Sequence, residues 1–144
     1  MNPALATDAS YGTVELKIPA KAEWVAVARL AVSAVASRLL FSVDEIEDVK
    51  LAIAEACTNC IQHGSGTDQI EITCEALASE LIITVRDRGV ALHFERVESK
   101  AGFGDEHRTE ELGVFLIRAL MDTVNYIVDQ KSGTELVMTK RVSE

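Results

Sequence analysis

Two neighbouring stretches of this chain alternate apolar and polar residues, and this period of two constrains the fold most strongly. The alternating residues are Ile70, Ile72 and Cys74 in the first stretch and Leu81, Ile83 and Val85 in the second. Because successive side chains of a strand point to opposite faces, each stretch predicts a strand with one buried face. The polar segment between them predicts a β-hairpin.

Three further segments have strand character. Residues 13–18 alternate strictly and are stopped by Pro19, which predicts a strand near the start of the chain. Residues 123–129 and 134–142 flank a turn-like segment that contains Gly133, and they predict a second hairpin.

Helical patterns fill the remaining periodic segments. Residues 22–39 are rich in Ala and Val without Gly or Pro, which predicts a helix buried on more than one side with Trp24 in the core. Ser42-Val-Asp-Glu45 is a capping box that predicts the start of a second helix, and Gly64 predicts its end. A third helix is expected over 112–121.

This order of elements predicts an α+β fold, in which helices cover one face of a mixed, mostly antiparallel sheet in a two-layer sandwich. A single domain is expected over 13–144, after a poorly ordered tail at 1–12. Residues 90–111 have no periodicity, and a segment of that length inside a compact domain is typical of a functional lid.

Composition excludes several classes of function. The net charge of −9 argues against direct binding of nucleic acid, which requires clustered Lys and Arg, but suits a basic protein partner. No apolar run reaches the roughly 18 residues of a membrane span and no signal peptide is evident, so a cytoplasmic protein is expected. Cys57 and Cys60 form a C-x-x-C pair inside an apolar helical pattern, and with Cys74 they are interpreted as small buried hydrophobes.

A polar stripe marks the second helix. Glu55 and Asn59 lie one turn apart on one face, and Gln62 or His63 extends the line. Taken alone, this stripe is best explained as the solvated side of an amphipathic helix. His63 has a second explanation as a cation at a helix C-terminus.

The alternative, a catalytic stripe, gains weight from motifs farther along. The motif residues are Asp44–Asn59, Gln62-His63, Asp87-x-Gly89, Leu112–Ile117, Leu120-Met-Asp122 and Met138-Thr-Lys140. In these segments the chain resembles the anti-sigma-factor serine/threonine kinases of the RsbW type. That group belongs to the ATPases that include histidine-kinase catalytic domains, gyrase B and Hsp90. The resemblance implies the histidine kinase-like ATPase fold, with ATP between the helical layer and the lid.

The resemblance also implies roles for individual residues. Asn59 matches the asparagine that is the family's protein ligand for Mg²⁺, and Glu55 matches the glutamate thought to accept the proton of the substrate hydroxyl. Asp87 matches the aspartate that accepts a hydrogen bond from the adenine amine, while Gly89 lets the backbone approach the ring. Thr134 matches a threonine that reaches adenine through water. From the local sequence alone, Asp87-x-Gly89 is also an ordinary turn and Thr134 an ordinary strand residue.

Gly113 opens the third helix, where backbone N–H groups can meet phosphates. Here the chain departs from its relatives, because Glu110 and Glu111 stand where the family usually carries glycine. The expected lid also contains cations that can offset these carboxylates, and Arg108 is a candidate for the γ-phosphate.

Together these features predict an anti-sigma factor that uses Mg²⁺ and ATP to phosphorylate a serine or threonine of an anti-sigma-factor antagonist. The implied setting is stress-response transcription control, with a sigma factor as the second partner and a homodimer as the implied assembly. Two alternatives stay open. One is a regulatory binding protein with weakened catalysis, and the other is a switch kinase of a stress-signalling complex.

Overall fold

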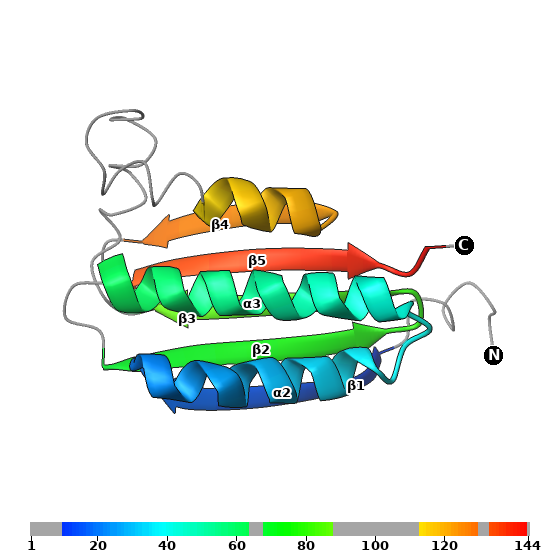
Figure 1. Cartoon of the computed structure of the whole chain (residues 1–144), viewed down its shortest axis with the longest axis horizontal. Coiled ribbons are helices and arrows are strands. Elements are labelled where there is room, and N and C mark those ends of the chain that lie inside the picture. The colour runs from blue at the N-terminus through cyan, green and yellow to red at the C-terminus, as the bar shows by residue number, and fades with distance from the viewer. Residues whose placement is uncertain (1–9, 64–67, 88–112, 130–132, 144) are drawn as a thin grey trace.

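The computed structural model describes residues 10–63, 68–87, 113–129 and 133–143. The elements in chain order are β1 (Ser10–Pro19), the 3₁₀ turn η1 (Ala22–Trp24), α2 (Val25–Ala36), α3 (Val43–His63), β2 (Gln69–Leu77), β3 (Glu80–Asp87), a helix over 113–120, β4 (Thr123–Asp129) and β5 (Gly133–Arg141). Figure 1 shows α2, α3 and the golden helix over 113–120 on one face of the sheet. The predicted α+β two-layer sandwich is therefore confirmed.

The sheet has the strand order β1-β2-β3-β5-β4. Every pairing among the described strands is antiparallel, so the mixed character expected from the sequence is not found in them. Both predicted hairpins form, as β2 with β3 and β4 with β5. Strand β1 begins at Ser10, so residues 10–12 belong to the sheet and not to the expected tail.

The core lies between this sheet and the helices. All six alternating residues of the first hairpin are buried, because the face of β2 and β3 that they share is covered by the helical layer. Helix α3 contributes Val49, Ile53, Ala56, Cys57 and Cys60 from one face, while Ile46 is only partly buried. At 25 cal/mol for each Å² of apolar surface, burial of a side chain such as Ile53 contributes about 1.5–3 kcal/mol.

The capping box at the start of α3 is confirmed. The Glu45 backbone N–H donates to Ser42 Oγ at 3.1 Å, and the Ser42 N–H donates to Glu45 Oε1 at 2.8 Å. These reciprocal bonds satisfy two backbone donors at the helix end and fix where the helix begins. The register of the polar stripe farther along α3 depends on that start.

The prediction for residues 22–39 was wrong in two respects. Residues 22–24 form the turn η1, where Trp24 is 41% exposed and so lies outside the core. Helix α2 is buried along one stripe only, formed by Ala28, Val32 and Ala36, because it packs on the sheet and α3 with its other side in solvent. Apolar composition alone did not reveal how many of its faces are covered.

Among the described residues, no helix is both long and apolar enough to cross a membrane.

Candidate functional site

The polar stripe of α3 faces away from the core. Glu55 and Asn59 are both partly exposed, while their neighbours Ala56, Cys57 and Cys60 are buried against the sheet. The helix therefore holds the carboxylate and the carboxamide one turn apart on a face that a ligand can reach.

The helix over 113–120 lies next to that stripe at Gly113, its first described residue. A Cβ placed on Gly113 would lie 3.4 Å from Glu55 Oε2, so the carboxylate lies close to this part of the helix. The fold thus brings Glu55 and Gly113 to one place, although 57 residues separate them in sequence.

A second polar pair lies where β3 ends and β5 begins. Asp87 and Thr134 are directly opposite each other in the antiparallel ladder, and their exposed fractions are only 1% and 2%. They are the buried polar residues of the described part of the chain. Thr134 Oγ1 has no hydrogen-bond partner among the residues that the structure describes. Because a buried hydroxyl normally has a partner, this oxygen fits a site that accepts a polar ligand or a water molecule.

Cys60 joins this pair from α3. Burial raises the pKa of its thiol well above the ordinary value, and the nearby Asp87 carboxylate, to which the thiol is hydrogen-bonded, raises it further. The neutral S–H therefore donates to Asp87. The sequence interpretation of Cys60 as a small buried hydrophobe is right about its burial but missed this contact, because no local pattern links a helix residue with a strand end.

Several predicted site residues lie outside the described residues. These are Gly89, Arg108, Glu110 and Glu111, together with the expected lid over 90–111. His63 ends α3, but only its backbone is described. The roles given to these residues, and the metal role of Asn59, remain predictions. Among the described residues no group of three or more His, Cys, Asp and Glu gathers as a metal site, and a magnesium ion held by one asparagine and phosphates does not require such a group.

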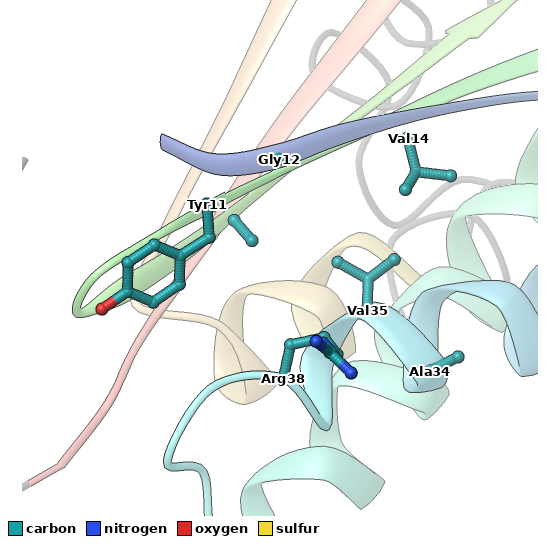
Figure 2. A pocket seen from close by; sticks show the side chains of 7 residues that line it. Tyr11, Gly12, Val14, Ala34, Val35 and Arg38 are labelled. Carbon is teal, nitrogen blue, oxygen red and sulfur yellow. The ribbon is translucent and has the colours of Figure 1, made fainter. Parts of the chain in front are cut away.

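A groove of about 440 Å³ lies between β1 and α2, lined among others by Tyr11, Val14, Val35 and Arg38. Figure 2 shows its β1 and α2 side chains on either side. The groove includes Ala76, whereas Asp87 pairs with Ile70 at the other end of β2. Six residues of strand span about 20 Å, so the groove is separate from the Asp87 site.

Comparison with known proteins supports a family assignment. Residues 18–140 match the family model of the histidine kinase-like ATPase domain. The chain is 43% identical over 140 residues to the serine-protein kinase RsbW of Bacillus cereus strain AH820, covering 92% of this chain and 86% of that protein. The same identity and coverage hold for RsbW of Bacillus mycoides strain KBAB4.

A solved structure shares the fold. The structure of the RsbU and RsbW domains of a Mycobacterium tuberculosis protein matches with a TM-score of 0.66 at 20% identity, over 92% of this chain and 32% of that one. The chain therefore belongs to the histidine kinase-like ATPase domain family, in which RsbW serine-protein kinases are its relatives.

Proposed function

We propose that this protein is an anti-sigma factor that uses Mg-ATP to phosphorylate a serine or threonine of an anti-sigma-factor antagonist. The observation that carries the proposal is that the Glu55 carboxylate lies next to Gly113, where the resemblance expects N–H donors for phosphate. A kinase needs a proton acceptor beside donors for phosphate oxygens, and these two groups supply both. The relatives at 43% identity are named serine-protein kinases, which supports protein as the phosphoryl acceptor.

In this proposal, Asp87 and Thr134 bind adenine. The Asp87 carboxylate accepts a hydrogen bond from the exocyclic amine, and the Thr134 hydroxyl meets the ring through water. Both side chains are buried and fixed by the β3–β5 register, so they discriminate between bases without rearrangement. Gly89 allows the chain to approach the ring.

The residues of α3 act at the phosphate end. ATP supplies the phosphoryl group and Mg²⁺ offsets its negative charge. Asn59 offers a neutral oxygen to the metal, and the N–H groups at Gly113 and the Arg108 guanidinium offer donors to phosphate oxygens. Glu55 would take the proton of the attacking hydroxyl, and it lies one turn from Asn59, the residue that would hold the metal.

The protein partners follow from the same proposal. Holding a sigma factor keeps it from RNA polymerase, and phosphorylating the antagonist preserves that inhibition. The net charge of −9 favours association with a basic partner, so the association rate should fall as salt rises. The proposed setting is a cytoplasmic homodimer in the stress response.

Two substitutions test the catalytic assignment. Glu55→Gln should abolish phosphate transfer to the antagonist while ATP affinity stays within a few-fold, and Asn59→Ala should weaken Mg-dependent ATP binding itself. Mass spectrometry of the antagonist after incubation with Mg-ATP measures transfer, and calorimetry measures binding. Equal loss of nucleotide binding in both variants would remove Glu55 from the role of a separate base.

One sequence feature favours a second candidate, a regulatory binding protein with weakened catalysis. Glu110 and Glu111 place two negative charges in the predicted phosphate loop. At an effective dielectric of 20, unit charges about 6 Å apart interact by roughly 3 kcal/mol before salt screening. If Glu111→Gly tightens ATP binding tenfold or more and the native chain gives no phosphorylated product, this second function is favoured.

A further inference from the structure

Lys140 of β5 makes contacts that link three elements of the fold, namely β5, the helix over 113–120 and α3. Its ammonium group donates to the Leu120 backbone carbonyl at 2.6 Å and lies 3.4 Å from Asp48 Oδ2. The Lys140 side chain is only 13% exposed. One partly desolvated cation therefore holds the C-terminal end of the helix over 113–120 against the first half of α3. A cation is also favourable at a helix C-terminus because of the helix dipole.

The two contacts between these helices define one alignment. Lys140 links Asp48 to the Leu120 carbonyl, and Glu55 lies next to Gly113. Seven residues separate the contact points on each helix. At 1.5 Å for each residue both spans are about 10 Å, so the antiparallel helices are held at matched points. A shift of the helix at Leu120 would therefore move Gly113 relative to Glu55.

Further interactions hold the C-terminal end of this helix. Ile117 is its one buried residue within the range 113–120, whereas Phe115 is 70% exposed. Just beyond the helix, Asp122 donates its N–H to Thr139 O at 2.9 Å and accepts from the Arg141 N–H at 2.6 Å. Leu120 also packs against the core and Met121, just beyond the helix, is buried, so apolar packing and these polar contacts hold the C-terminal end together.

We propose that Lys140 is a positioning residue for the phosphate end of the nucleotide site. By holding Leu120 and Asp48 together, it keeps Gly113 beside the Glu55 carboxylate. This inference rests on the proposed function for its consequence in ATP binding. Recognition of adenine should not depend on Lys140, because the β3–β5 ladder sets the Asp87–Thr134 pair.

Lys140→Gln removes the cation, and Lys140→Arg keeps it. Arg141→Gln is the matched control, because Arg141 follows on the same strand and makes an exposed ion pair with Glu80 at 3.5 Å. Calorimetry with Mg-ATP and with Mg-ADP measures how far each substitution weakens the binding of each nucleotide, and the ratio of the two losses tests the proposal. We expect Lys140→Gln to weaken ATP binding about tenfold, the scale of one hydrogen bond to a charged group, with a several-fold smaller effect on ADP. Lys140→Arg should recover most of the loss, and Arg141→Gln should resemble the native chain.

Amide hydrogen exchange of the nucleotide-free proteins gives a second readout. Lys140→Gln should accelerate exchange in the helix over 113–120 about tenfold while β3 and β5 stay protected. Asp48→Asn, which keeps the bond to Leu120, should give an intermediate effect.

Equal weakening of ATP and ADP, or unchanged exchange over 113–120, would overturn the inference. If the native chain binds neither nucleotide, the proposed function fails, and the exchange experiment alone then decides whether Lys140 positions the helix.

Discussion

Replacing Thr134 by valine should change stability and nucleotide affinity in opposite directions. The Thr134 side chain is 2% exposed, and Oγ1 has no hydrogen-bond partner in the described part of the chain. A buried hydroxyl without a partner carries a desolvation penalty of about 1–3 kcal/mol. Valine keeps the shape of the side chain and suits a strand, so the free energy of unfolding of the nucleotide-free protein should rise by about 1 kcal/mol or more.

The same substitution removes the hydroxyl that is proposed to reach adenine. Loss of one neutral hydrogen bond weakens binding by about 0.5–1.5 kcal/mol, which is a factor of roughly two to ten in Kd. At saturating ATP the stabilisation by ligand falls by the same amount, so the two proteins should become similar in stability. Without nucleotide, the valine variant should melt about 3 °C higher.

Urea unfolding with and without Mg-ATP, together with calorimetry, measures both effects. Thr139→Val is the matched control, because Thr139 lies on the same strand but is partly exposed, so water can satisfy its hydroxyl. A nucleotide-free Thr134→Val protein that is less stable than the native chain would show that Oγ1 is satisfied within the fold. Unchanged ATP affinity would remove Thr134 from the site.

Three further substitutions or reactions test other parts of the structure. The hydrogen bond from the Ser42 N–H lowers the pKa of Glu45. The stabilisation of the fold by the ionised Glu45 is therefore full above the ordinary pKa of 4.5 and is lost as the pH falls through the lower folded-state pKa. Glu45→Gln should flatten this part of the profile of unfolding free energy against pH, as measured by urea unfolding from about pH 3 to 6. Burial raises the pKa of Cys57 to about 12 and of Cys74 to about 11, so a thiol reagent near pH 8 should modify them only after unfolding, and rapid reaction of the native protein would contradict their burial. Gly113→Ala should change the free energy of unfolding by no more than about 1 kcal/mol but weaken ATP binding, because its methyl group would lie 3.4 Å from Glu55 Oε2 in the proposed phosphate site. Unchanged affinity in calorimetry would show that phosphates bind elsewhere.

Local patterns predicted the elements well because their causes are local. The capping bonds of α3 join residues three positions apart, and the two hairpins follow from alternation on either side of a short turn. The exposure of Trp24 could not be predicted in this way, since it depends on where α2 lies over the sheet.

Contacts between elements that are distant in sequence could be predicted only in part. The resemblance to a known family brought Glu55, Asp87, Gly113 and Thr134 together as candidates, although their separations in sequence gave no sign of proximity. The structure places Glu55 next to Gly113 and pairs Asp87 with Thr134, and it leaves their roles and ligands as proposals. Neither periodicity nor the family motif showed that Lys140 bonds to the Leu120 carbonyl, because that contact depends on a backbone atom whose position only the fold determines.

The position of the undescribed segment 88–112 in the chain links the two halves of the site. This segment follows Asp87 directly and ends directly before Gly113, so its two ends are the proposed adenine-binding carboxylate and the proposed phosphate-binding helix. The fold itself sets where these two neighbouring residues lie, because Asp87 is held in the β3–β5 ladder and Gly113 lies next to Glu55 of α3. The Lys140 contacts hold the helix over 113–120 against α3, so the proposed phosphate end of the site is positioned by the same strand, β5, that carries Thr134 at the adenine end.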